Sequence, residues 1–428
     1  MSPINLRRHW PALVVVSVAL YVGPSCSAQG SKAPATCTAA PGVLVAKTDA
    51  GWKSIGPGDA VPAKTPLVSL FYSVLKSANG GVEVVLAADP AQRGPLPILE
   101  SAVLLHDDAK HDLALSPLRG LIVMKNVKKD GPAVIEVRRD SDSAEVTLKE
   151  PGAMLAMEIY SRHAPGKPKL DPKQDEPVVH LFLIAVSGEV FLRHGDKGWT
   201  LHAPPGPAVL VWDSLLRQPE IQRLEEMPAE YKALKTDKKM LDEACACCAK
   251  LKAKAHADAL KTVAASKESL ERKAAVIAMG ALDELPLLLD TLATTPHADA
   301  RDTAILALRH WLGRAPGQTV KLYAALVTAG YSVPQSQTVL QLLCGFTPDQ
   351  QGDPDTYEVL VDNLKHTKAA VRALSHWHLV RLASPGKSIA YDPQAPEADL
   401  HRAYKQWREL IPVGKLPPPP PKAGADSR

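Results

Sequence analysis

The composition of the chain changes near residue 218, and this change limits the folds that are open to it. Before that point, short β-forming runs are separated by turn residues such as Asn79-Gly80-Gly81, Asp130-Gly131 and Pro151-Gly152. After it, Ala, Leu, Lys and Glu dominate, and Pro and Gly lie at the boundaries of helical runs. Many short strands between turns indicate a sandwich or roll, whereas successive short helices indicate antiparallel helix pairs. We therefore expect an N-terminal all-β part followed by a C-terminal all-α part.

The β part is expected over residues 42–215 as an all-β sandwich or roll, after a flexible leader over 29–41. Two phrases within it are related: Gly51-Trp52 precedes Pro57-Gly58, and Gly198-Trp199 precedes Pro205-Gly206. One explanation of both phrases is an internal repeat, in which a strand with a core Trp is followed by a turn and a second strand. The alternative is that common turn residues recur by chance. The candidate strands are Val43–Ala46, Leu67–Leu75, Val82–Ala87, Ala102–His106, Leu121–Lys125, Ala133–Arg138, Ala144–Leu148, Met154–Ile159, Val178–Val186, Val190–Arg193 and Ala208–Trp212.

The β part resembles the FecR-like domain of bacterial envelope proteins. The resemblance rests on Gly-bounded strands, on the phrase 188–193 (Gly-Glu-Val-Phe-Leu-Arg) and on the stretch 198–214 that begins Gly-Trp-Thr-Leu-His. It implies an extracytoplasmic β module that binds a protein or a glycan. Regulators of this family carry a cytoplasmic anti-sigma region before a membrane helix. Only about ten residues precede the apolar run of this chain, too few for a folded domain, so we do not expect a transmembrane anti-sigma role.

The helical part is expected as connecting helices over 218–263 and repeated helices over 265–410. Three helices share a pattern in which Arg is followed by a small residue at +3 and an apolar residue at +7, positions that lie on one helix face. The sets are Arg272, Ala275 and Met279; Arg301, Ala304 and Leu308; and Arg372, Ser375 and Leu379. This pattern resembles HEAT-type repeats, and the resemblance implies an α-solenoid with a scaffold or protein-binding role. Helices are expected near 268–281, 284–294, 298–312, 317–329, 335–345, 355–366, 368–383 and 397–409.

The first 28 residues have the layout of a secretory signal peptide. Arg7 and Arg8 precede the apolar run Ala12–Val22, and cleavage after Ala28 is expected. As a helix the run would be about 16 Å long, against about 30 Å for a bilayer core. We therefore expect a periplasmic or envelope protein that meets the membrane only if the N-terminus stays uncut or Cys26 carries a lipid. At the other end, the prolines of 416–428 predict a Pro-rich disordered tail.

The charge balance argues against a nucleic-acid binder. The 428 residues include 50 Lys and Arg and 46 Asp and Glu, for a net charge of +4. Proteins that bind nucleic acids obtain much of their affinity from a strongly basic surface, which this composition does not supply. We expect no nucleic-acid partner.

Two local clusters carry residue types that bind metals. Cys245, Cys247 and Cys248 could form a redox pair or hold a metal, but no second Cys pair completes a zinc site, and ordinary helix positions explain them more simply. The other cluster offers five ligand groups within seven residues, which a polar turn between strands also explains. It consists of His106, Asp107, Asp108, His111 and Asp112.

No motif indicates catalysis, and we expect neither an enzyme nor a cofactor. Trp377 is expected in the core, with His376 and His378 exposed on either side of it. Arg309, Lys321 and Arg381 are candidate solenoid contacts, although the sequence does not define a partner-binding site. The favoured hypothesis is an exported, non-enzymatic binding or scaffold protein of the bacterial envelope with a protein or glycan partner. The alternatives are an envelope signalling or sensor component, and a metal- or thiol-redox protein that uses the three neighbouring cysteines.

Overall fold

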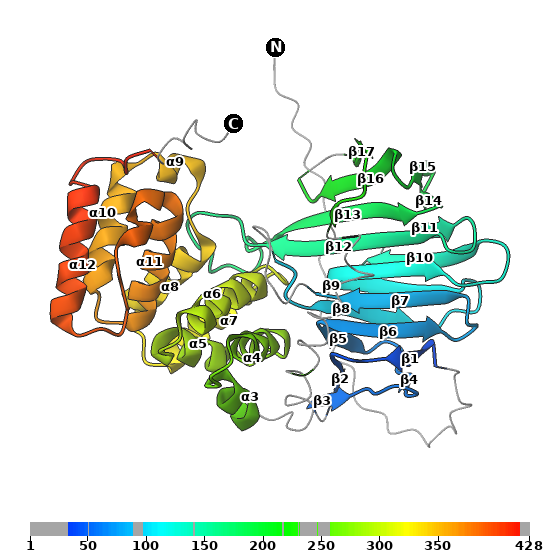
Figure 1. The fold of residues 1–428 in the computed structure, drawn as a ribbon, viewed down its shortest axis with the longest axis horizontal. Coiled ribbons are helices and arrows are strands. Elements are labelled where there is room, and N and C mark those ends of the chain that lie inside the picture. The colour runs from blue at the N-terminus through cyan, green and yellow to red at the C-terminus, as the bar shows by residue number, and fades with distance from the viewer. Residues whose placement is uncertain are drawn as a thin grey trace, which may run out of the picture. The chain divides into compact units, whose positions relative to one another are not determined.

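A computed structural model describes residues 33–49, 51–88, 97–139, 142–215, 218–229, 231, 246 and 257–419. Strands fill its N-terminal part, and about ten helices fill its C-terminal part (Figure 1). The predicted order, β and then α, is thus confirmed. The predicted signal peptide over 1–28 and the three neighbouring cysteines lie outside the described residues. Within the described part, no helix combines the length and the apolar character needed to cross a bilayer.

Seventeen strands form one mixed sheet. They include a strand at every position where the sequence predicts one. The strands are β1 (Ala35–Ala39), β2 (Val43–Thr48), β3 (Gly51–Ser54), β4 (Ala60–Val61), β5 (Pro66–Leu70), β6 (Tyr72–Ser77), β7 (Val82–Ala87), β8 (Ser101–His106), β9 (Leu113–Asn126), β10 (Ala133–Arg139), β11 (Asp142–Leu148), β12 (Met154–Arg162), β13 (Val178–Ser187), β14 (Glu189–His194), β15 (Lys197–His202), β16 (Gly206–Asp213) and β17 (Glu220–Leu224).

The long strand β9 joins two strand sets. The first set runs β4-β1-β6-β7-β9-β12-β13-β16-β17. The second runs β3-β2-β5-β8-β9-β10-β11-β14-β15, and its β9–β10 pair is parallel. Gly120 lies where β9 exchanges partners, at φ 91°, and a Cβ there would be 2.3 Å from the Glu100 carbonyl oxygen. Only glycine fits this crossing without strain.

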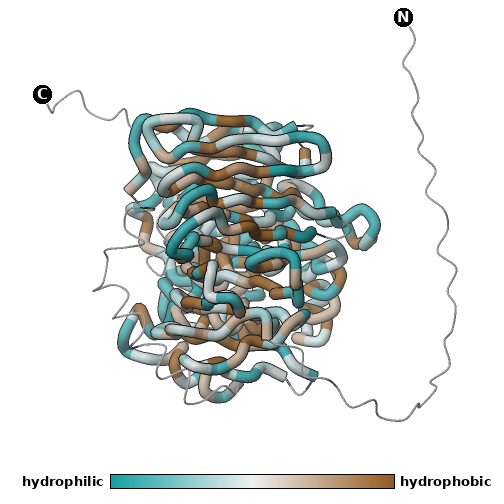
Figure 2. The backbone as a smooth tube through the Cα atoms, turned by 90° about the vertical axis from the view of Figure 1, so that its right-hand side faces the viewer, coloured by the Kyte–Doolittle hydropathy of each residue, from teal (hydrophilic) through white to brown (hydrophobic). Residues whose placement is uncertain are grey.

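Both strand sets contribute to one apolar core. Leu67 and Leu105 of the second set belong to the same buried cluster as Leu75 and Ile122 of the first. Side chains alternate between buried and more exposed positions along strands such as β7, as expected for strands with one face in a core. Figure 2 shows apolar residues along the strands and polar residues at many of the turns.

Two segments depart from the predicted boundaries. The leader predicted as flexible over 29–41 contains β1, whose backbone pairs with β6 and β4 and whose Cys37 side chain is fully buried. The connecting region predicted as helical over 218–263 begins with β17, which pairs with β16. The side chains of β17 are nearly all exposed, so the strand lacks the alternation that would have identified it. The two Gly-Trp phrases lie in β3 and β15, the two edge strands of the second set.

Each of the eight predicted helical runs coincides with a helix. Several begin at clear signals, for example at Ser332 and Thr347, whose side chains form capping boxes with Gln335 and Gln350. The helices are α3 (Ala257–Ala264), α4 (Ser269–Ala281), α5 (Leu285–Thr294), α6 (Ala298–Leu312), α7 (Gln318–Thr328), α8 (Val333–Cys344), α9 (Pro348–Gln351), α10 (Pro354–Asp362), α11 (Ala369–Leu382) and α12 (Glu397–Leu410), with 3-10 turns η1 (Asn363–Lys365) and η2 (Ser384–Ser388).

The repeated Arg pattern has one structural role in all three helices. Arg272, Arg301 and Arg372 each donate to the backbone carbonyl six residues earlier, in the turn before the helix. The carbonyls belong to Ser266, Thr295 and His366, at 2.8, 2.6 and 2.5 Å. The small residue at +3 is fully buried in each case. The pattern therefore couples each helix to the turn that precedes it.

The β part and the helical part share a core. Residues 33–428 form one compact unit. Val68 and Leu70 of β5 and Phe71 belong to the same buried cluster as the apolar residues of α4, α6, α8 and α11. The Trp52 indole N–H also donates to the Leu282 carbonyl at 3.2 Å. The two predicted parts therefore pack together through apolar contacts and hydrogen bonds.

Candidate functional site

A cleft of about 810 Å³ lies between the β part and the helical part. We call it the sheet–helix cleft. Strands β12 and β13 and the segment after β12 line one wall, and helices α4, α6, α8 and α11 line the other. Clefts of this size at the junction of two structural parts are common binding sites.

The sheet wall carries stacked rings. Tyr160 of β12 lies opposite His180 of β13 in the strand register, and the two rings stack with centroids 4.8 Å apart. The Nε of Arg162 donates to His180 Nε2 at 2.9 Å. Burial and the Arg162 charge lower the pKa of His180, and burial raises the pKa of Tyr160. Both rings are therefore neutral at neutral pH and give the wall a flat surface with a cation at its end.

The helix wall is built around Trp377 of α11. The guanidinium of Arg381 lies 3.6 Å from the indole centroid, and that of Arg309 lies 5.2 Å from it. Arg381 Nη1 also donates to the Trp377 carbonyl at 3.0 Å, and Arg309 Nη1 donates to the Leu343 carbonyl at 2.5 Å. Stacking and hydrogen bonding hold both guanidiniums at the cleft. These are two of the three solenoid contacts suggested by the sequence, whereas Lys321 is exposed on α7 outside the lining.

The acidic groups of the cleft do not balance its cations. Asp299 accepts from Arg272 Nη2 at 2.7 Å and from Arg272 Nε at 3.1 Å, and it also accepts from Ser269. Burial would raise the pKa of Asp299, but these hydrogen bonds outweigh it and lower the pKa. Its charge is thus matched by Arg272. Asp302 is exposed, and among the described residues it has no ion pair within 4 Å.

His310 and Cys344 of the helix wall are neutral at neutral pH. Burial lowers the pKa of His310 to about 4, although the nearby Glu100 opposes the shift. Burial raises the pKa of Cys344 to about 12, so this side chain is a thiol and not an activated thiolate. The chemistry that the cleft offers is therefore binding by fixed cations and aromatic rings.

Close contacts hold the two walls together. Gly313, at the end of α6, lies so near β12 that a Cβ would be 2.3 Å from the Ser161 carbonyl oxygen. Nearby, Glu100 pairs with both Arg119 and Arg314, and Arg314 Nη1 donates to the Gly280 carbonyl at 2.7 Å. These contacts join strands to the ends of α4 and α6, so they fix the spacing of the cleft walls.

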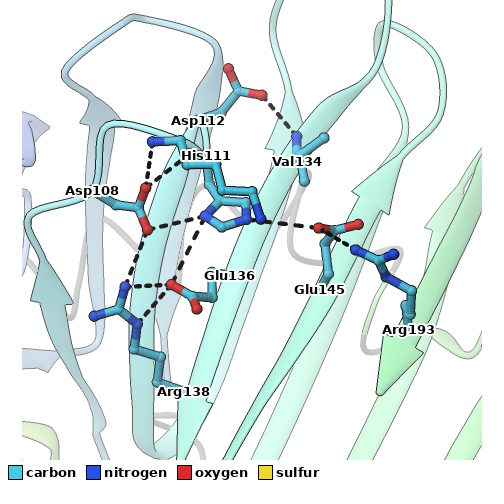
Figure 3. A network of polar contacts seen from close by, with 9 residues as sticks. Asp108, His111, Asp112, Val134, Glu136, Arg138, Glu145 and Arg193 are labelled. Carbon is cyan, nitrogen blue, oxygen red and sulfur yellow. Dashed lines mark hydrogen bonds and ion pairs between the residues drawn. The ribbon is translucent and has the colours of Figure 1, made fainter. Parts of the chain in front are cut away.

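The candidate metal cluster of the sequence is only partly brought together. Asp108 and His111 converge with Glu136 of β10, with one ligand atom of each within 4.8 Å of the others (Figure 3). His106 instead contacts Ser116 Oγ at 2.8 Å, and Asp107 is exposed. Glu136 reaches this group because β10 pairs with β9. It lies 25 residues after His111, so the local spacing of residues does not predict its place in the group.

An arginine already occupies the oxygens that a metal would use. Arg138 Nη2 lies 3.1 Å from Asp108 Oδ2 and 2.5 Å from Glu136 Oε2, as Figure 3 shows. His111 Nδ1 lies 3.0 Å from the same Asp108 oxygen, and Glu145 is on its other side. Hydrogen bonds from His111 and from the backbone outweigh burial and lower the pKa of Asp108. The group is an ion-pair network whose cation is Arg138.

The last candidate of that cluster has a structural role. Asp112 accepts from Lys128 Nζ at 2.7 Å, from the Val134 backbone at 2.8 Å and from Asn79 Nδ2 at 2.7 Å. In Figure 3 its carboxylate faces Val134 and lies apart from the Asp108 group. Asp112 thus ties the start of β9 to β10 and to the β6–β7 turn.

The prediction that His376 and His378 are exposed is wrong. His378 is 5% exposed, and its Nε2 lies 2.6 Å from the Leu342 carbonyl oxygen. The His376 ring packs against Tyr391 in a tilted arrangement, with centroids 4.6 Å apart, and its Nε2 is buried. Leu342 of α8 lies against His378, and Tyr391 and Trp407 lie against His376, so residues at i and i+2 of α11 are both covered. The sequence pattern of a single helix does not show how many neighbours surround it.

No family model, no curated protein and no solved structure matches this chain.

Proposed function

We propose that this chain is an exported, non-enzymatic binding protein of the bacterial envelope that holds a partner in the sheet–helix cleft. The observation that carries the proposal is the pair of guanidiniums, Arg309 and Arg381, fixed on Trp377 at an open cleft. Fixed cations beside an aromatic ring are suited to recognition. The thiol of Cys344 and the neutral His310 fit binding better than covalent or acid–base chemistry.

The architecture we propose has two modules. A FecR-like sandwich or roll is supported by the two strand sets that share one core. HEAT-type repeats are supported by the recurring hydrogen bonds of Arg272, Arg301 and Arg372 to the turns before their helices. Export is supported by the basic start, apolar run and small residues before Gln29.

Site-specific photo-cross-linking tests this function. A photoreactive amino acid is placed at Tyr160 or Lys273, which line the cleft, and at the exposed Lys405 of α12 as a control. In cells of the source organism, the two cleft positions should give the same discrete adduct in the envelope fraction, and position 405 should not. Intact mass should show a chain that starts near Gln29. Equal adducts at all three positions, or none at the cleft, would refute the proposal.

A further inference from the structure

Four cationic side chains line the sheet–helix cleft without an acidic partner. They are Arg162, Lys273, Arg309 and Arg381, and within the described part of the chain none has a carboxylate oxygen within 4 Å. They come from four separate elements, β12, α4, α6 and α11. Near the cleft, three other arginines have acidic partners: Arg272 with Asp299, Arg301 with Asp392, and Arg314, just after α6, with Glu100. The cleft is thus a local exception.

The acids at the cleft do not remove this surplus. Asp299 is matched by Arg272, so Asp302 is the other acid of the lining, and its charge acts on Arg381 and Lys273 from beyond ion-pair distance. Arg309 is half-buried and Arg381 is exposed, and both guanidiniums lie close to the Trp377 indole. The four cations therefore leave a positive surplus along the cleft, and such a surplus favours the binding of negative charge from outside the chain.

The geometry also limits the form of that negative charge. Arginine donors are arranged in a planar fork that matches the two oxygens of a carboxylate or a phosphate. Arg309 Nη1 donates to the Leu343 carbonyl and Arg381 Nη1 to the Trp377 carbonyl, and within the described residues the other donors of the two guanidiniums have no hydrogen bond. A volume of about 810 Å³ is far larger than one small anion requires. The body of the ligand can then pack on the Tyr160–His180 stack.

We infer that the sheet–helix cleft binds a ligand with at least two oxyanion groups, carboxylate or phosphate. Arg309 and Arg381 take one group, and Lys273 and Arg162 take another. This inference rests on the proposed function, because it names the chemistry of the partner that the cleft holds. The two sources of such groups are a free polyanion and an acidic segment of a protein.

Isothermal titration at low ionic strength tests the inference with three probes: citrate, inorganic pyrophosphate and a tetraglutamate peptide. At least one should bind at micromolar to millimolar concentration, and added salt should weaken it. Preference for citrate or pyrophosphate indicates a free polyanion, and preference for the peptide indicates an acidic protein segment. The absence of binding by all three probes at millimolar concentration overturns the inference.

Charge variants locate the site. Lys273→Gln and Arg381→Gln should each weaken binding by about tenfold or more, the usual effect of losing a charge-assisted hydrogen bond. Lys53→Gln and Lys405→Gln remove the same charge from exposed positions on β3 and α12 and should leave affinity within about twofold. Arg381→Lys keeps the positive charge but loses the planar fork of donors. Its affinity should lie between that of Arg381→Gln and that of the surface controls, a graded effect that a general folding defect would not produce. Equal loss in all variants overturns the inference.

The outcomes separate this inference from the proposed function. If a partner cross-links at Tyr160 and Lys273 but neither the probes nor the charge variants affect it, the binding function stands and the oxyanion chemistry is wrong. If the probes bind through Lys273 and Arg381 but no partner cross-links, the oxyanion site stands and the envelope-binding function is wrong.

Discussion

Glu100 and Arg314 form an ion pair between the β part and the helical part, and their side chains are only 3% and 11% exposed. Arg119 Nε donates to the same Glu100 oxygen at 2.8 Å. Burial alone would raise the pKa of Glu100, but Arg314 and Arg119 outweigh it and hold the pKa at about 2. One buried carboxylate thus pairs with two guanidiniums at the junction that supports the cleft, and Asp283 is a second acid for Arg314 at 3.3 Å.

Glu100→Gln should lower the free energy of unfolding by about 3 kcal/mol or more, because it leaves Arg119 without its carboxylate and Arg314 with only the half-exposed Asp283. Urea denaturation at neutral pH measures the change. Arg402→Gln, which breaks the exposed pair with Asp399, should cost less than about 1 kcal/mol. A similar small loss in both variants would show that the Glu100 pair does not hold the two parts together.

Glu100 should also contribute to acid sensitivity. Its folded pKa of about 2 lies below the ordinary value of about 4.3. Its stabilisation is therefore fully present above that ordinary value and is lost as pH falls through about 2. Across this window the stability of Glu100→Gln should depend on pH less steeply than that of the native chain, measured by urea midpoints at each pH. Parallel curves would contradict the assignment.

His378 should add a second pH dependence at milder acidity. Burial lowers its pKa to about 4, against about 6.5 when unfolded, and Arg309 and Arg381 add to the shift. The unfolded chain therefore binds the proton first as pH falls from about 6.5 to 4, and up to about 3 kcal/mol of stability is lost. His378→Gln keeps a donor for the Leu342 carbonyl and should flatten this part of the curve. His401→Gln, at an exposed position on α12, should leave the curve unchanged.

Most of the fold could be predicted because its signals are local. Helix starts such as Ser332 with its capping box, and turns such as Asn79-Gly80-Gly81, are set within a few residues. The exceptions lack a local signal. β17 exposes nearly all its side chains, and β1 is short and lies among small and polar residues that are typical of a flexible leader. Both segments become strands because they pair with other strands of the sheet, and the pattern of a single sequence does not show this pairing.

The site was less predictable than the fold because distant segments build it. Arg309 and Arg381 were identified as solenoid contacts, but their meeting at Trp377 depends on how α6 packs on α11. Tyr160 and His180 carry no motif and meet only through the β12–β13 register. A surplus of unpaired cations is likewise a property of the packed structure. The net charge of +4 for the whole chain gives no sign of it.

Asp175 should be the main anchor of the segment between β12 and β13. Its carboxylate accepts from the Gly317 and Thr319 backbone amides, both at 3.1 Å, from Thr319 Oγ1 at 2.9 Å and from His163 Nε2 at 2.6 Å. Asp175→Ala removes this cap of α7 and should cost about 2 kcal/mol or more. Asp171→Ala, in an exposed part of the same segment, should cost less than about 1 kcal/mol. Thermal denaturation compares the two, and equal costs would contradict the anchoring role.

Arg138 should be the permanent cation of the Asp108 group. It pairs with both Asp108 and Glu136, so the native chain needs no added cation there. The melting temperature of the native chain should therefore not respond to Zn²⁺ or Mn²⁺. Arg138→Ala should lower stability by about 1–2 kcal/mol, because the carboxylates then repel one another. In that variant Arg138 no longer pairs with the converging oxygens of Asp108 and Glu136, and divalent ions that bind there with His111 should restore part of the loss. A melting temperature of the native chain that rises with Zn²⁺, and falls back in Glu136→Gln, would instead make the group a metal site.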